Sequence, residues 1–254
     1  YGVVYNSADG DLQLSGYVSG YNLSGASYDA IEFGVNSQDT GPQDIAFNTD
    51  GTKMYVVGLT NDAVYQYSLS TAFDLSTASY DSVSFSVASQ NSVPTGLTFS
   101  PDGTKMFLIG PLDIIHQYSL STAFDLSTAS YASLSLRVSA QDSENIGLVF
   151  NTTGTKMYVL GRATQSVYQY TLSTAFNVST ASYDSVSFSV FSQETGPEGI
   201  ALSSDGTKMF ISGRTGDDVN QYTLSTAFDL STASFDSVTF AVTSQTTEPV
   251  GVVF

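Results

Sequence analysis

Residues 100–110 read Ser-Pro-Asp-Gly-Thr-Lys-Met-Phe-Leu-Ile-Gly. Asp side chains hydrogen-bond to their own backbone and Gly accepts a positive φ, so this stretch predicts a tight turn leading into an apolar strand. Its core, Gly-Thr-Lys-Met, recurs at residues 51–54, 103–106, 154–157 and 206–209, which are 52, 51 and 52 residues apart. A period near 50 residues indicates a propeller, a solenoid or another repeat array.

Each repeat contains the pattern of four short strands, which we call a, b, c and d in chain order. In the second complete repeat they are expected at residues 96–99, 105–109, 114–120 and 133–138. Most of these segments are rich in β-branched, aromatic or aliphatic residues and are bounded by turn residues. A four-stranded antiparallel sheet in every repeat is typical of a β-propeller blade.

The two ends of the chain complement each other. Residues 1–5 align with strand b, residues 11–14 with strand c and residues 30–35 with strand d, whereas residues 251–254 align with strand a. We therefore predict an all-β, five-bladed β-propeller in one domain, residues 1–254, closed by the C-terminal strand a joining the N-terminal strands b, c and d. The expected blades are residues 1–43 with 251–254, 44–95, 96–146, 147–198 and 199–250.

The composition excludes several kinds of site. Lys and Arg total 7 against 24 Asp and Glu, a formal net charge of −17, which argues against binding nucleic acid or an anionic membrane surface. There is no Cys and a single His, His116, so Cys-based and multi-His metal sites are excluded. The Asp-Gly turns lack the spacing of a calcium loop. We expect no metal and no cofactor.

A lysine and a glutamine recur at fixed positions, and we expect both to stabilise the scaffold. The lysines follow the a–b turn, and acidic residues such as Asp74 and Asp81 recur around the c–d connection, so we expect ion pairs between neighbouring blades. The second of these acidic positions is an aspartate in four copies and Ala132 in the fifth; the aspartates are Asp29, Asp81, Asp184 and Asp236. A glutamine on strand c would clamp one blade to the next. These positions are Gln13, Gln66, Gln117, Gln169, Gln221, Lys53, Lys105, Lys156 and Lys208.

The copies differ mainly in the b–c and d–a connections, which emerge on the same face of a propeller. Recognition commonly uses variable loops on a rigid scaffold, although drift in exposed loops produces the same variability. The candidate ligand-binding residues in or beside these loops are Gln43, Asp62, Thr95, Asp113, Glu198, Arg162, Arg214 and Asp217. We predict no catalytic residues.

The motif at residues 100–107 resembles the core repeat of YVTN/NHL-like and WD40-like propellers. The longer unit at residues 65–87 is similar to repeats in extracellular proteins of marine bacteria and in phage virion proteins such as tail fibres. The resemblance covers essentially the whole chain, and it implies a propeller fold. Propellers host many unrelated activities, so it carries little information about function.

From these observations we predict a non-catalytic β-propeller for binding or adhesion at an extracellular or virion surface. Its partner would be a surface glycan or a protein, with self-assembly a further expectation, and neither nucleic acid nor membrane insertion is expected. The alternative is a structural subunit of an extracellular filament or phage particle. A five-bladed glycosidase-like enzyme would need two carboxylates near the axis, for which Asp44 and Glu198 are the candidates.

Overall fold

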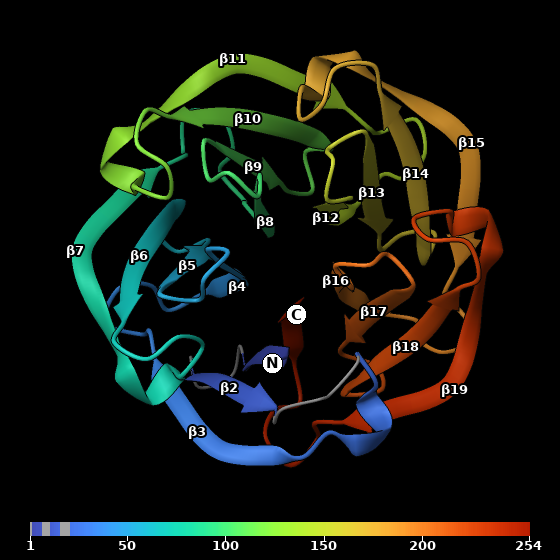
Figure 1. The fold of residues 1–254 in the computed structure, drawn as a ribbon, viewed down its shortest axis with the longest axis horizontal. Helices are drawn as coiled ribbons and strands as arrows, with labels where there is room; N and C mark the ends of the chain where they lie inside the picture. Colours follow the sequence, from blue (N-terminus) through green and yellow to red (C-terminus); the bar gives the residue numbers. More distant parts are fainter. Residues whose placement is uncertain (1, 7–10, 16–20) are drawn as a thin grey trace.

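The computed structural model describes residues 2–6, 11–15 and 21–254, with side chains described from residue 21 onward. The described residues form five four-stranded antiparallel sheets arranged around a central axis (Figure 1). The expected class, an all-β propeller whose blades have four antiparallel strands, is confirmed.

Four of the sheets are each made of consecutive strands. The first contains β4 (Pro42–Phe47), β5 (Lys53–Gly58), β6 (Ala63–Leu69) and β7 (Ala78–Ser86). The second contains β8 (Gly96–Phe99), β9 (Lys105–Ile109), β10 (Ile114–Leu120) and β11 (Ala129–Arg137). The third contains β12 (Asn145–Phe150), β13 (Lys156–Gly161), β14 (Ser166–Leu172) and β15 (Ala181–Ser189). The fourth contains β16 (Pro197–Leu202), β17 (Lys208–Gly213), β18 (Asp218–Leu224) and β19 (Ala233–Ala241).

The remaining sheet combines the two ends of the described chain. In it, β20 (Pro249–Val253) pairs with β1 (Gly2–Asn6), which is followed by β2 (Asp11–Ser15) and β3 (Tyr28–Gly34). The pairing of β20 with β1 is antiparallel and aligns Val253 with Val3. Figure 1 shows β4, β8, β12, β16 and the C-terminal strand nearest the axis, so the first strand of every sheet faces the centre.

The turn between the first two strands of a blade requires its glycine for two reasons. Gly51 has φ 72°, a conformation that L side chains rarely adopt. In addition, a Cβ at Gly51 would lie 2.4 Å from the ring of Phe73. The Phe73 N–H also donates to the Gly51 carbonyl at 2.9 Å, which ties the connection after β6 to this turn.

Each connection between the third and fourth strands contains a three-residue 3₁₀ helix. The helices are η1 (Leu23–Gly25), η2 (Leu75–Thr77), η3 (Leu126–Thr128), η4 (Val178–Thr180) and η5 (Leu230–Thr232). An Asp or Asn caps each one; Asp74, for example, accepts from the Ser76 N–H at 3.0 Å. None of the helices in the described residues is long and apolar enough to cross a bilayer.

The fourth strand starts earlier than the sequence predicted. Residues 133–138 were expected in the second blade, whereas β11 spans Ala129–Arg137. The ladder with β10 shifts register between Gln117 and Tyr118, and Ser133 has φ 58° at this bulge. The bulge leaves Ala132 and Ser133 without partners on β10, and the alternation of more and less exposed residues is broken there, which hides the start of the strand from the sequence pattern.

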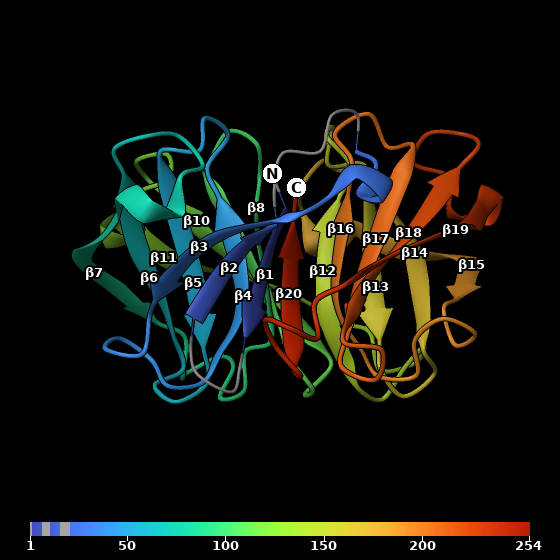
Figure 2. The same ribbon diagram turned by 90° about the horizontal axis from the view of Figure 1, so that it is seen from below.

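We call the face that carries the 3₁₀ helices and the glycine turns the turn face, and the opposite face the loop face (Figure 2). Adjacent blades pack through apolar side chains; Tyr55 and Val57 of one blade join Leu97 and Met106 of the next in one buried cluster. The Tyr55 hydroxyl donates to the Phe124 carbonyl of that neighbouring blade at 2.6 Å. The repeated aromatic residues therefore contribute to the contact between sheets.

Candidate functional site

The inner strands share one crowded position next to the axis. Four of them have glycine there, and a Cβ would meet the neighbouring inner strand: it would lie 2.7 Å from the Ile146 carbonyl at Gly96 and 2.6 Å from the Val250 carbonyl at Gly199. In β4 the equivalent residue is Asp44. The glycines are Gly96, Gly147, Gly199 and Gly251.

The Asp44 side chain fits because it bridges neighbouring inner strands. Its Oδ2 accepts from the Leu97 N–H of β8 at 2.8 Å, and its Oδ1 accepts from its neighbour Ile45 at 2.9 Å. On the other side, a Cβ on Gly251 of β20 would lie only 2.6 Å from Asp44 Oδ1. The carboxylate thus occupies space that glycine leaves free in the adjacent strand.

Asp44 lies at one end of a central cavity of about 210 Å³. Inner strands of all the sheets line this cavity, through Leu97, Leu148, Ile200 and Val252 as well as Asp44. The lining reaches the glycine turns at Thr49 and Pro101, so the cavity opens toward the turn face. Asp44 is the one ionisable side chain in the described lining.

The surroundings of Asp44 favour its protonated form. Burial raises the pKa of this carboxyl to about 7, although the backbone N–H groups of Leu97 and Ile45 act in the opposite direction. No cationic side chain in the described lining offsets the burial. A carboxyl group with a pKa near neutrality can both accept and donate a proton under ordinary conditions.

A second carboxylate, Glu198, lies at the start of β16 near the loop face. Its side chain is 4% exposed, and Arg214 Nε donates to its Oε1 at 2.6 Å. Arg162 pairs with the other oxygen of Glu198 and donates to Glu144 at 2.7 Å. Burial raises the pKa of Glu198, and the charges of Arg162 and Arg214 oppose that shift. Its negative charge is therefore neutralised inside the protein.

The structure thus brings together three of the candidate ligand-binding residues, Glu198, Arg162 and Arg214. Gln43 is the second residue of β4 and Thr95 directly precedes β8, and both contact backbone carbonyl groups. Gln43 donates to the Pro42 carbonyl at 3.1 Å, and Thr95 to the Ile146 carbonyl at 2.9 Å. These contacts stabilise the inner ring.

The other three candidates form loop turns. Asp62, Asp113 and Asp217 have φ 48°, 59° and 48°, in the left-handed region that Asp tolerates better than most residues. The carbonyl of Asp62 accepts from the Val87 N–H at 2.8 Å, and those of Asp113 and Asp217 make the equivalent contacts. Turn geometry therefore accounts for these aspartates.

Sequence reasoning missed a set of buried carboxylates on the loop face. Asp39 is 2% exposed and accepts from the backbone N–H groups of Gly41, Thr60 and Asn61, at 2.8, 3.2 and 3.1 Å. Asp142 and Glu194 hold the corresponding loops of other blades in the same way. The sequence feature that could have identified them is the acidic residue that directly follows the glutamine repeated after strand d. The variability of the loops concealed this feature.

The glutamine clamp connects blades as expected. Gln66 Oε1 accepts from the Leu126 N–H of the next blade at 2.9 Å, and Gln117 and Gln169 make the equivalent contacts with Val178 and Leu230. Gln221 reaches Leu23 in the same way at 2.7 Å. Gln13 lies among residues whose side chains are not described.

The expected ion pairs between blades are wrong. Lys53 pairs with Asp81 at 3.4 Å and Lys208 with Asp236 at 2.7 Å, each within a single sheet. Lys156 and Asp184 form the same pair in the third blade, at 3.4 Å. The bulge in the fourth strand places the aspartate opposite the lysine of its own blade. Lys105, whose blade has Ala132 at the position of the aspartate, has no such partner in the described residues.

No protein-family model matches the chain. No curated protein matches it either. The resemblance to YVTN/NHL-like, WD40-like and phage repeats therefore has no support beyond the propeller fold itself.

Solved structures, in contrast, share the fold. A protein described as a candidate 6-phosphogluconolactonase from Bacteroides fragilis matches with a TM-score of 0.54 and 13% identity, over 96% of this chain and 67% of that one. A protein with the same description from Bacteroides uniformis gives 0.53 and 15%, over 95% and 68%. The periplasmic gluconolactonase of Pseudomonas aeruginosa gives 0.50 and 13%, over 98% and 71%.

These comparisons correct the functional prediction. The three propellers just named are lactonases by name, which are enzymes, so the predictions of a non-catalytic adhesion or structural protein and of no enzyme activity are wrong on this comparison. At such low identity the likeness shows the fold alone. The reaction of this chain has to be argued from its own residues.

Proposed function

We propose that the protein is a hydrolase that opens small, neutral cyclic esters in the central cavity, with Asp44 as the general base. The observation that carries the proposal is the replacement of the inner-strand glycine by Asp44 in one blade. This substitution supplies the one ionisable group of the described cavity lining.

The proposed reaction is the hydrolysis of a lactone to a hydroxy acid. The ionised Asp44 removes a proton from a water molecule as the water oxygen attacks the ester carbonyl carbon. The ring C–O bond then breaks, and Asp44 returns the proton to the departing alkoxide. A pKa of about 7 suits both steps, because the carboxyl is then partly ionised near neutral pH.

Two features support a neutral lactone as the substrate class. The lactone chemistry is taken from the names of the similar propellers. Neutrality is inferred from the lining, because an anionic group would meet Asp44 without any described cationic side chain to bind it. The apolar part of the lining includes Leu97, Leu148 and Ile200 around the axis, and it offers no opposite charge to an anionic substrate.

The glycosidase-like alternative does not suit this geometry. A glycosidase uses two carboxyl groups on either side of the bond that breaks. Asp44 lies in the cavity, whereas Glu198 is absent from its described lining and is bound by Arg162 and Arg214. A single base that activates water requires only Asp44.

The proposal is tested with δ-valerolactone, a small neutral ring, by following acid release above the spontaneous rate. Asp44→Asn should lower kcat/KM roughly 100-fold or more, the usual contribution of a general base. Asp44→Gly restores the residue of the other copies, so it should fold and be equally inactive. Asp205→Asn, which removes a charge from an exposed turn, should keep full activity. Wild-type hydrolysis that is no faster than the spontaneous rate, or is unchanged in Asp44→Asn, refutes the proposal.

An extracellular or virion-surface location is a separate proposal, motivated by the resemblance of residues 65–87 to repeats of such proteins. So is a glycan or protein partner of the loop face. Fractionation of the native source would test the location, and recovery in the cytosol would contradict it.

A further inference from the structure

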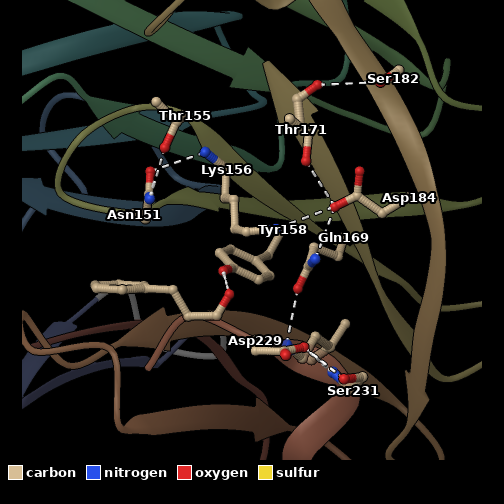
Figure 3. A network of polar contacts seen from close by, with 12 residues as sticks. Asn151, Thr155, Lys156, Tyr158, Gln169, Thr171, Ser182, Asp184, Asp229 and Ser231 are labelled. Carbon is tan, nitrogen blue, oxygen red and sulfur yellow. Dashed lines mark hydrogen bonds and ion pairs between the residues drawn. The ribbon is translucent and has the colours of Figure 1, made fainter. Parts of the chain in front are cut away.

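In three blades one aspartate oxygen collects donors from neighbouring strands. Asp184 Oδ2 accepts from Gln169 Nε2 at 2.8 Å, from Thr171 Oγ1 at 3.0 Å and from Lys156 Nζ at 3.4 Å (Figure 3). Asp81 and Asp236 occupy the same position in their own blades. The glutamine and lysine distances are 2.8 and 3.4 Å at Asp81, and both are 2.7 Å at Asp236.

The second blade retains the donors and lacks the acceptor. Lys105, Gln117 and Ser119 occupy the positions of Lys156, Gln169 and Thr171, and the aspartate is replaced by Ala132. The backbone there is unchanged. The bulge residue Ser133 has φ 58°, and its counterparts Ser82 and Ser185 have 58° and 60°. The substitution therefore removes a carboxylate group while the backbone conformation of the bulge residue is kept.

No carboxylate of the described residues takes the place of the missing aspartate. Gln117 is 2% exposed, and its Oε1 accepts from the Val178 N–H at 3.1 Å. Within the described residues its Nε2 has no acceptor, and Lys105 Nζ has no carboxylate within ion-pair distance. Lys105 Nζ lies instead 5.9 Å from the centre of the Phe176 ring. A largely buried amide and an unpaired ammonium group make a site that favours an anion.

We propose that this site, formed by Lys105, Gln117 and Ser119 beside Ala132, binds a short carboxylate anion of the size of formate or acetate. The anion takes the place of the missing aspartate side chain and accepts from the same three donors. Its size is set by the difference between Asp and Ala, which is one carboxylate group. A carboxylate suits these donors better than chloride does, because its two oxygens can accept from divergent donors.

The inference is tested by thermal unfolding in sodium acetate against sodium chloride at the same ionic strength. Acetate at about 100 mM should raise the midpoint of the wild type by roughly 2–4 °C more than chloride does, because a ligand that binds only the folded state stabilises it. Ala132→Asp supplies the carboxylate covalently and should abolish this difference. An equal acetate effect in wild type and Ala132→Asp would overturn the inference, as would no acetate effect in the wild type.

The third blade provides a matched gain-of-binding control. Asp184→Ala recreates in that blade the arrangement of the second, so it should lower the midpoint in chloride and respond more strongly to acetate than the wild type. If Ala132→Asp fails to fold, Lys105→Met is the substitute variant. It removes the ammonium group while keeping the apolar stem, so it should abolish the response to acetate that the wild type shows. The inference would also be overturned if acetate raised the midpoint of Asp184→Ala while the wild type and Lys105→Met responded to acetate equally.

Discussion

Strands β4 and β16 have the same place in their blades, yet they carry their carboxylates one residue apart. β4 has Gln43 followed by Asp44, whereas β16 has Glu198 followed by Gly199. Glu198 is bound by Arg162 and Arg214, whereas among the described residues Asp44 is bound by the backbone N–H groups of Leu97 and Ile45 beside a cavity. A shift of one residue along the strand thus separates a neutralised structural carboxylate from one that can exchange protons.

The largest effect is expected when Glu198 loses its neutralising partners. Replacing both Arg162 and Arg214 with Met leaves a buried carboxylate unpaired, which should lower the free energy of unfolding by about 3–5 kcal/mol. Adding Glu198→Gln to the double variant should recover most of that loss. The measurement is urea unfolding at pH 8. Arg137→Met, at an exposed position of β11, is the control for the loss of a positive charge.

The next effect concerns the pH dependence that Asp44 imposes on stability. Its pKa is raised by burial from 3.8 to about 7, so the folded state binds this proton more tightly than the unfolded state does. Stability should therefore decrease as the pH rises from about 4 to about 7, with a total loss of about 4 kcal/mol. Asp44→Asn should remove this component, so that the variant exceeds the wild type in stability at pH 8.

Unfolding in urea from pH 4 to pH 8 would measure the difference between wild type and Asp44→Asn. That difference should grow over the window and level off above pH 7. A difference that is independent of pH would mean that Asp44 is ionised throughout and resembles Glu198 after all.

The smallest change in stability is expected at the crowded inner-strand position, which accommodates Asp44 in β4 and is glycine in β16. A Cβ on Gly199 would lie 2.5 Å from Ser212 Oγ and 2.6 Å from the Val250 carbonyl. Gly199→Ala should therefore cost about 1–3 kcal/mol from overpacking, measured by the same unfolding experiment. An unchanged stability would show that the inner ring adjusts easily, and that the glycine in four blades does not reflect crowding.

The blades could be predicted from the sequence because the features that mark their strands and turns lie within a few residues of one another. The Gly-Thr-Lys-Met turns and the match between residues 1–5 and strand b reflect turn chemistry and strand periodicity, which act within a few residues. The pairing of Lys53 with Asp81 was misassigned to neighbouring blades, because it depends on a bulge that strand periodicity does not reveal.

The site was harder to predict for a different reason. Asp44 and Glu198 were both recognised as carboxylates near the axis, but their roles depend on partners from other blades. Arg162 lies 36 residues from Glu198, and Leu97 lies 53 residues from Asp44. The burial and the charge partners of such carboxylates depend on how the blades pack around the ring. The sequence of a single strand does not predict this packing.

The most direct test of the central claim, that Asp44 is a proton-transferring group in the cavity, is the pH dependence of kcat/KM for δ-valerolactone hydrolysis. The account predicts a rate that rises about tenfold per pH unit at low pH and levels off above an apparent pKa near 7. The Asp44→Asn variant should not show this rise in kcat/KM with pH. A wild-type rate that levels off near pH 4, or a profile that Asp44→Asn shares, would contradict it.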